Sequence, residues 1–248
     1  MRFARAFALA AALAFAVAAD AGAQTAEPTA AVKEAVREII REYLLEHPEV
    51  IEQAMIALNA KRGEEKRARE RAALVENRTA LTEHPLSPVS GNPDGEVTLV
   101  EFFDYQCGYC KRSLGPVMEL LESEGGLRIV WKEFPILGPV SRFAARAAMA
   151  AHRQGLYLEY HVAMMGAAGK LSEERAMEIA GRVGLDVERL RRDMADPAIE
   201  AYLDETHRLA TDLGIDGTPA FVIGDKLVPG AVGGARLKDL IAEAANAG

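Results

Sequence analysis

The feature that most constrains this 248-residue chain is the stretch from Val97 to Lys111, which holds both of its cysteines. Its first seven residues, Val97 to Phe103, are almost all β-branched or aromatic, as is typical of a strand covered on both faces of a sheet. Cys107 and Cys110 follow within a few residues, and the segment after them has apolar residues at helical spacing. We therefore expect a central strand followed by a helix, with the cysteine pair at the N-terminus of that helix.

A position at a helix N-terminus favours reactivity of the two cysteines as thiols. Unpaired backbone N–H groups and the helix dipole stabilise a thiolate, so Cys107 is predicted to be a nucleophile. The spacing of three residues puts Cys110 on the same helix face, where it can close or resolve a disulfide. The alternative, half of a zinc site, needs two further ligands at suitable spacing. The chain has no second cysteine pair and its five histidines occur singly, so we expect no metal and no organic cofactor.

The first 23 residues have the three parts of a secretory signal peptide: Arg2 and Arg5, an apolar run to Ala19, and small residues up to Ala23. We expect cleavage after Ala23 and export, because the apolar run is too short and too Ala-rich for a membrane anchor. The net charge of −8 argues against a nucleic-acid partner. Exported proteins can use several disulfides to stabilise their fold, but this chain has one cysteine pair. We therefore expect the pair to have a catalytic rather than a structural role.

Residues 24–78 are expected to form an N-terminal helical region. A first apolar stripe runs from Val32 to Leu44 at helical spacing. It ends before Pro48, which suits the first turn of a second amphipathic helix. We predict that these two helices form a hairpin too small to bury both stripes, so that it packs either on the main domain or on a second copy of the chain. Of the two, we favour association of copies through residues 32–72.

The end of this region differs in composition. From Lys61 to Arg71 nearly every residue is charged, with acids and bases interleaved. This pattern favours a solvated linker helix supported by pairs such as Glu65 with Arg69, four residues apart. A basic binding patch is the weaker alternative, because the acidic residues offset the basic ones.

Residues 79–248 are predicted to be the main domain. Its entry, residues 79–95, is rich in Pro, Gly, Ser and Asn. After the cysteine helix, residues 127–134 predict a second strand that pairs in parallel with the first. Residues from about 138 to 214 carry only helical signals, which predicts a helical subdomain inserted into the sheet domain.

The end of the chain predicts a return to the sheet. Two short apolar runs are separated by Gly224 and Asp225, which favour a tight hairpin. A final helix over about Ala235 to Ala245 is expected to cover it. The predicted class is therefore α/β, a sheet with helices on both faces preceded by an α-helical module.

The order of these elements resembles the thioredoxin fold, and the residues from Glu101 to Lys111 resemble its DsbA-like branch. A second motif, Gly217-Thr218-Pro219, stands where that family has a cis-proline facing the cysteines. The resemblance implies that Pro219 is cis, although a trans proline is the commoner form in general. It also implies that the backbone of Thr218 pairs with an extended substrate peptide.

Glu101 is the only ionisable residue in the predicted central strand. Burial should raise its pKa and let it exchange a proton with Cys110, and the resemblance implies an acidic residue at this position. The alternative is a structural ion pair with Lys132 on the neighbouring strand, and the two are compatible.

The mechanism implied is thiol–disulfide exchange, in which Cys107 attacks a substrate disulfide and either the substrate thiol or Cys110 resolves the mixed disulfide. The residues between the cysteines, Gly108 and Tyr109, are expected to tune this balance and to contact substrate. Gly108-Tyr109 together with Thr218 resembles the isomerase DsbC.

Residues 32–72 resemble the N-terminal association region of ScsC-like proteins, in which oligomerisation goes with isomerase or reductase activity. The function expected is a periplasmic disulfide isomerase or reductase. Its partners would be misfolded or reduced exported proteins and a membrane redox partner. A monomeric dithiol oxidase is the alternative. Another class is a chaperone or copper-binding protein that holds Cu(I) between the cysteines, although no Met or His cluster lies near the pair in the sequence.

Overall fold

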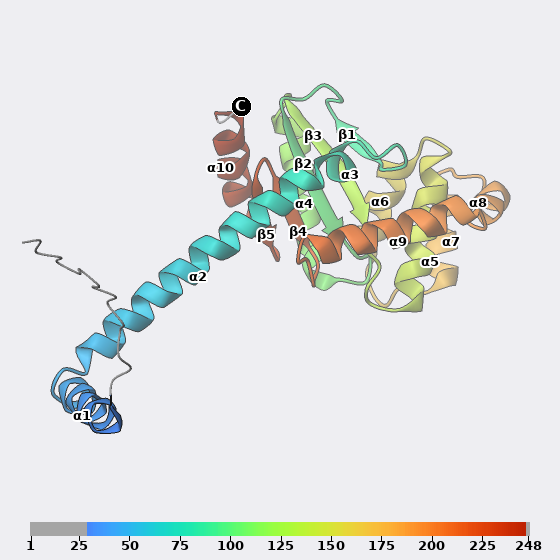
Figure 1. Cartoon of the computed structure of the whole chain (residues 1–248). Coiled ribbons are helices and arrows are strands. Elements are labelled where there is room, and N and C mark those ends of the chain that lie inside the picture. The colour runs from blue at the N-terminus through green and yellow to red at the C-terminus, as the bar shows by residue number, and fades with distance from the viewer. Residues whose placement is uncertain (1–28, 247–248) are drawn as a thin grey trace, which may run out of the picture. The chain divides into compact units, whose positions relative to one another are not determined.

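The computed structural model describes residues 29–246 (Figure 1). The predicted signal peptide, residues 1–23, lies outside the described residues. The chain divides into two compact units, with the boundary between Asn59 and Ala60. Within the described range, none of the helices is both long enough and apolar enough to cross a membrane.

The second unit is built on a five-stranded sheet with the strand order β1-β3-β2-β4-β5. The strands are β1 (Val89–Gly91), β2 (Val97–Phe103), β3 (Leu127–Glu133), β4 (Ala220–Ile223) and β5 (Lys226–Pro229). β2 pairs in parallel with β3 and antiparallel with β4, while β1 and β5 add antiparallel edges. The predicted central strand, the parallel pair and the C-terminal hairpin are confirmed.

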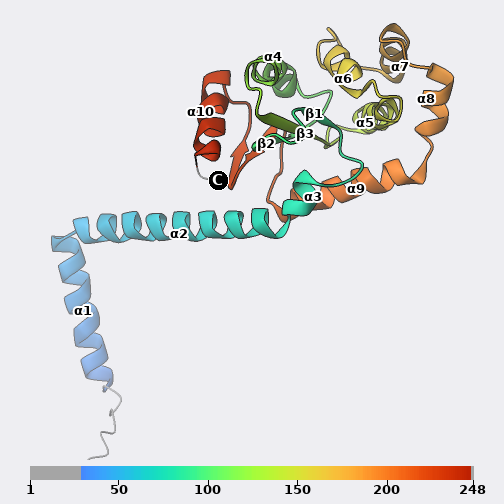
Figure 2. The same ribbon diagram turned by 90° about the horizontal axis from the view of Figure 1, so that it is seen from above.

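Helices cover both faces of this sheet, and others pack beside it. The helices after α2 (Glu49–Glu76) are α3 (Arg78–Thr82), α4 (Gly108–Ser123), α5 (Pro139–His152), α6 (Tyr157–Met165), α7 (Glu173–Arg182), α8 (Val187–Asp193), α9 (Pro197–Asp212) and α10 (Gly234–Ala245). Seen from above, α4 and α10 lie on one face and α3 and α9 on the other (Figure 2). Helices α5 to α9 all fall between β3 and β4, which confirms the predicted helical insertion.

The two faces of β2 pack into different clusters, which explains its nearly unbroken apolar sequence. Leu99 and Phe103 point toward α4 and pack in one core with Val117. Val100 and Phe102 point to the opposite face and pack in a second core. Because side chains alternate along a strand, only a strand covered on both sides needs apolar residues at every position.

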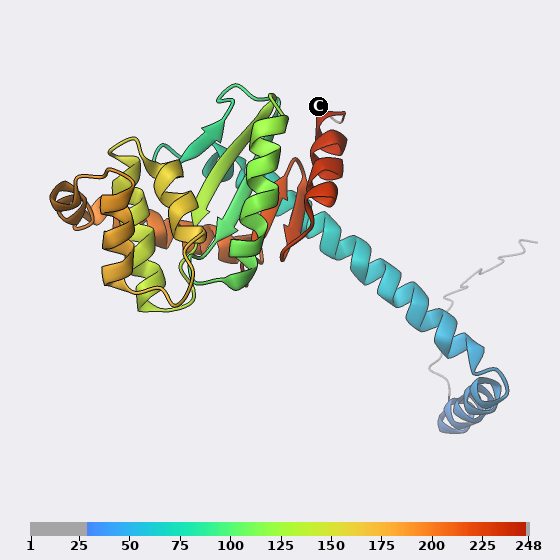
Figure 3. The same ribbon diagram turned by 180° about the vertical axis from the view of Figure 1, so that it is seen from behind.

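Side chains cap three of the helix starts in the insertion. The side chains of Ser172, Asp186 and Asp196 each accept a hydrogen bond from a backbone N–H in the first turn of α7, α8 and α9. These bonds satisfy donors that a helix start otherwise leaves unpaired. From behind, the insertion forms its own group of helices beside the sheet (Figure 3).

The N-terminal region is helical as predicted, with α1 (Ala30–Glu46) and α2 (Glu49–Glu76). The predicted hairpin is wrong, because α1 and α2 do not pack along each other. The charged stretch after Lys61 belongs to a continuous α2 and is mostly solvent-exposed. Near the end of α2, Leu74 packs in the second core with Leu81 of α3, so this end of the helix contributes to the core of the sheet unit.

Strand β1 and helix α3 lie in the segment that the sequence marked only as a domain entry. β1 has three residues, too few to show an alternating pattern, and it exists because it pairs with the edge of β3. Its last residue, Gly91, has φ +82°, a conformation that favours glycine. A side chain there would also collide with the carbonyl oxygen of Leu127 and crowd Leu121.

We expect Gly91→Ala to lower the free energy of unfolding by about 2 kcal/mol or more, because it combines left-handed backbone strain with a collision against main chain. Gly125→Ala is the matched control, since a Cβ at Gly125 meets nothing within 4 Å. Urea denaturation of both variants measures the difference. Equal stability of the two variants would contradict this account of β1.

Candidate active site

Cys107 is the N-cap residue of α4, where the helix starts directly beyond the end of β2. Its Sγ accepts from the backbone N–H of Cys110 at 3.5 Å, and as a thiol it donates to the carbonyl oxygen of Thr218 at 3.2 Å. Burial by itself raises the pKa of the Cys107 thiol. Hydrogen bonds from the Thr218 side chain, from Cys110 and from the backbone N–H of Tyr109 favour the thiolate and outweigh burial, so the net pKa is lowered from its ordinary value.

Cys110 has the opposite character. It is 1% exposed, whereas Cys107 is 7% exposed, so a substrate disulfide meets Cys107 first. Burial raises the pKa of the Cys110 thiol, and its proximity to Cys107 adds to the effect. Both cysteines are free thiols in this structure. The sulfur of Cys107 is thus the nucleophile, and the sulfur of Cys110 stays protonated until it attacks the mixed disulfide.

The Gly217-Thr218-Pro219 motif lies beside the cysteines in the folded chain. The Thr218–Pro219 peptide bond is cis, as the resemblance implied, and it directly precedes β4. The carbonyl of Thr218 faces Cys107 across 111 residues of sequence. Gly108 and Tyr109 are exposed in the first turn of α4, and the guanidinium of Arg112 lies 4.2 Å from the centre of the Tyr109 ring.

Glu101 lies on the face of β2 that points toward α4 and is 3% exposed. Burial, followed by the negative charge of Cys107, raises the pKa of Glu101 to about 8. The alternative pairing with Lys132 is wrong. Glu101 is opposite Trp131 in the sheet register, so Lys132, the next residue, points to the other face. There its Nζ donates to the carbonyl of Ala80 and to Ser87 Oγ, both at 2.7 Å.

Asp104 is a site residue for which no role was predicted from the sequence. Its buried carboxylate accepts three hydrogen bonds, from the backbone N–H of Gln106 at 2.7 Å, Ser141 Oγ at 2.7 Å and the backbone N–H of Leu137 at 2.9 Å. These donors come from the turn before Cys107, the loop after β3 and the start of α5. The signal was available, because an acid three residues before the nucleophile follows a buried strand.

A second missed group is a buried network beneath the same turn. Tyr105 and Tyr157 donate to Glu133 Oε1 at 3.1 and 2.9 Å, and Tyr105 Oη lies 3.2 Å from His161 Nδ1. Burial raises the pKa of Glu133 well above its usual value, and it lowers the pKa of His161 to about 3. No sequence signal reveals this network, since Tyr157 and His161 come from the insertion.

The site is a pair of thiols at the start of a helix that follows the central strand of a mixed sheet, and the thiols face a cis-proline. A low-pKa sulfur beside a buried, protonated one can exchange thiols for disulfides and needs no cofactor to do so. This fold and site define a thioredoxin-type thiol–disulfide oxidoreductase. Nowhere among residues 29–246 do three or more His, Cys, Asp or Glu side chains form a group that could hold a metal ion.

Family models name the class more closely. The DsbA-like thioredoxin domain matches residues 98–242, more than half of the chain, and the N-terminal domain of the copper resistance protein ScsC matches residues 33–65. This chain therefore belongs to the DsbA-like thioredoxin domain family.

Solved structures agree. A thioredoxin-like oxidoreductase from Silicibacter pomeroyi is 48% identical, with a TM-score of 0.68 over 69% of this chain and 99% of its own. Proteus mirabilis ScsC in a transitional conformation is 28% identical, with a TM-score of 0.67 over 89% of this chain and 100% of its own. The second match extends into the N-terminal helices as well as the sheet unit, because it covers more of the chain.

Among curated proteins, the Na(+)/H(+) antiporter NhaA 1 of Salinispora arenicola is 32% identical over 140 residues. That match covers 56% of this chain and 22% of the antiporter. The chain thus spans about a fifth of the length of the curated relatives it matches.

We expect Cys107 in a Cys110→Ser variant to react with iodoacetamide with a midpoint below about pH 8.5, the ordinary thiol value. The reason is the set of hydrogen bonds that lowers the pKa of Cys107. Alkylation rates measured from pH 4 to 10 give the midpoint. In the reciprocal Cys107→Ser variant, Cys110 should stay unreactive across neutral pH, and rapid alkylation of Cys110 would contradict its burial.

We expect Glu101→Gln to flatten the pH dependence of stability. The folded state holds the Glu101 proton up to about pH 8, whereas the unfolded chain releases it near 4.5. Stability is therefore lost as the pH rises through this window, by about 1.4 kcal/mol per pH unit from this group. Urea denaturation at pH 5 and pH 8 measures it. Equal slopes in wild type and variant would show that Glu101 is not the group.

Proposed function

We propose that this protein is an exported thiol–disulfide oxidoreductase of the periplasm that isomerises or reduces wrong disulfides in other exported proteins. The Cys107 thiolate attacks one sulfur of a substrate disulfide, which forms a mixed disulfide and releases the other sulfur as a thiolate. That thiolate can attack a different disulfide of the substrate, which completes isomerisation.

Reduction follows if Cys110 acts instead. The Cys110 thiol passes its proton to Glu101, attacks Cys107 Sγ and expels the substrate thiolate, which leaves a Cys107–Cys110 disulfide. A membrane redox partner would then return two electrons to the pair. The raised pKa of Glu101 supports this role, since a neighbouring group that titrates near neutral pH can accept and return a proton.

The observation that carries the isomerase proposal is the apolar surface of α1 and the start of α2. All of these side chains are between 39% and 74% exposed: Val32, Val36, Ile39, Ile40, Tyr43, Leu45, Ile51, Met55, Ile56 and Leu58. So many large apolar groups on two helices mark a surface that another molecule covers. We propose that the cover is a second copy of the same segment.

Self-association bears on the direction of the chemistry. Several active sites held in one assembly can retain a misfolded chain while its disulfides are sampled, and they can hinder the partner that oxidises monomers. The match of residues 33–65 to the ScsC N-terminal domain supports the same view.

A second candidate function, the monomeric dithiol oxidase, is favoured by the stabilised thiolate of Cys107. Hydrogen bonds that hold the thiolate stabilise the reduced enzyme and make its disulfide a stronger oxidant. The chaperone or copper-binding alternative is supported by the two thiols and the ScsC match alone.

Export to the periplasm is supported by the predicted signal peptide and by the exchange chemistry.

We expect the chain from Gln24 onward to sediment as an oligomer at micromolar concentration and to recover activity from scrambled ribonuclease in a glutathione buffer. Ile40→Glu should produce monomers and lose most of this isomerase activity, because it puts a charge on the apolar surface. The matched control is Arg41→Gln, which changes the net charge equally without replacing an apolar residue. Analytical ultracentrifugation and the ribonuclease assay measure both properties.

A monomeric wild type that oxidises reduced ribonuclease, and does not repair scrambled ribonuclease, would favour the oxidase. If a Cys110→Ser variant trapped no mixed disulfides with periplasmic proteins, this result would count against thiol–disulfide exchange. It would favour the chaperone or copper-binding alternative.

A further inference from the structure

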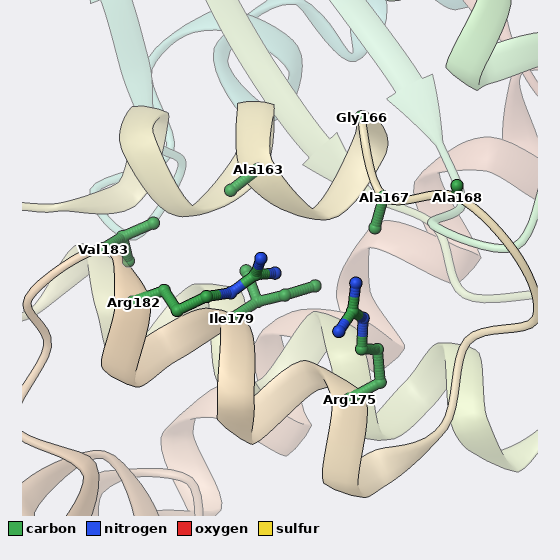
Figure 4. Close-up of a pocket in the computed structure, with 8 residues that line it drawn as sticks. All are labelled: Ala163, Gly166, Ala167, Ala168, Arg175, Ile179, Arg182 and Val183. Atoms are coloured by element: carbon green, nitrogen blue, oxygen red, sulfur yellow. The ribbon is translucent and has the colours of Figure 1, made fainter.

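Two arginines line a cavity between α6 and α7, and neither cysteine is part of its lining. The cavity has a volume of about 410 Å³, and Arg175 and Arg182 are the two charged residues in a lining that otherwise consists of glycine, alanine, isoleucine and valine. Figure 4 shows both guanidinium groups in the space between the two helices. The apolar wall consists mainly of Ala163, Ala167, Ile179 and Val183.

Neither arginine is held by a strong ion pair among the described residues. Arg175 pairs with Glu178 at 3.2 Å, but the Glu178 side chain is 63% exposed, so the pair is weak. The Arg182 side chain is solvent-exposed and makes no hydrogen bond or ion pair with any residue that the structure describes. No acidic side chain lines the cavity.

Arg182 lies in the last turn of α7, where its positive charge suits the helix dipole. A basic side chain beside a helix C-terminus commonly also donates to its last carbonyls. The C-terminal end of α6 borders this cavity, yet within residues 29–246 neither guanidinium donates to a backbone carbonyl there, so both keep donors for a ligand. The arginines are seven residues apart on α7, about 10 Å along one face, and are placed to bind two anionic groups or one extended acidic segment.

The cavity is linked to the helix that carries the cysteines. Lys111 directly follows Cys110, and its Nζ donates to the carbonyl oxygen of Ala167 at 2.9 Å. Ala167 is itself part of the cavity wall. A polypeptide joined to Cys107 can therefore continue over Lys111 toward the two arginines, gaining about 3.3 Å per extended residue.

We propose that Arg175, Arg182 and the apolar wall form a subsite for an acidic segment with apolar residues in the unfolded substrate polypeptide. Guanidinium groups bind carboxylates through paired hydrogen bonds, and the apolar wall accepts the side chains between them. The cavity is larger than a lone carboxylate requires, which favours a polypeptide over a small anion. This inference rests on the proposed function, because it names a class of substrate for the same cysteines.

The first test measures binding without chemistry. Two cysteine-free peptides of one length carry the same neutral dye, and Asp and Glu in the first are Asn and Gln in the second. Fluorescence anisotropy with the full chain should show about fivefold tighter binding of the acidic peptide. Arg182→Gln should remove most of this preference, and Arg175→Gln should weaken it.

Arg191→Gln is the matched control. Arg191 is exposed on α8, does not line the cavity, and loses the same charge when substituted. It should keep the full preference for the acidic peptide. Equal binding of the two peptides by wild type would overturn the subsite, and so would an equal loss in Arg182→Gln and Arg191→Gln. Inorganic phosphate that competes as well as the acidic peptide would show a small-anion site and overturn the polypeptide proposal.

The second test uses the same peptides with one cysteine as a glutathione mixed disulfide. Arg182→Gln should raise KM about fivefold for the acidic peptide, with little change in kcat or in the reaction of the amide peptide. An equal effect on both peptides would count against the subsite. Preferential binding without any exchange would support the subsite and reject the proposed function, so the two failures are distinguishable.

Discussion

The hydrogen bonds of Asp104 are the interaction on which the active site depends. Its buried carboxylate holds the turn before Cys107, the loop after β3 and the start of α5 together. A buried carboxylate must be hydrogen-bonded, so these donors have little freedom to move elsewhere. The sulfur of Cys107 is thereby positioned at the start of α4 by the sheet and the insertion at once.

The two cysteines differ because their surroundings differ. Cys107 lies at the helix end, with backbone N–H groups that stabilise the thiolate, while Cys110 lies one turn further in, where burial favours the thiol. Burial also raises the pKa of Glu101, on the strand beneath, to about 8, so that near neutral pH its carboxyl can both accept and release a proton. One short segment thus holds a nucleophile, a resolving thiol and a group that can take up the proton of that thiol, which is sufficient for exchange without a cofactor.

The N-terminal helices raise a separate physical problem. Their apolar residues are exposed within one chain, whereas the sheet unit buries its apolar residues in two cores. The hairpin expected from the sequence is not formed, because α1 and α2 do not pack along each other, and no residue of α1 is buried. The same surface is therefore best understood through association, which connects the N-terminal helices to the direction of the chemistry.

The sequence by itself determined the central strand, the cysteine helix, the capped helices of the insertion and the C-terminal hairpin, because periodicity, caps and turn residues act locally. The resemblance added the cis-proline. Only the tertiary structure decided that Lys132 turns away from Glu101, that β1 pairs at the sheet edge, and that Tyr105, Glu133 and His161 meet. Those contacts depend on sheet register and on how distant helices pack, and neither leaves a local signal in the sequence.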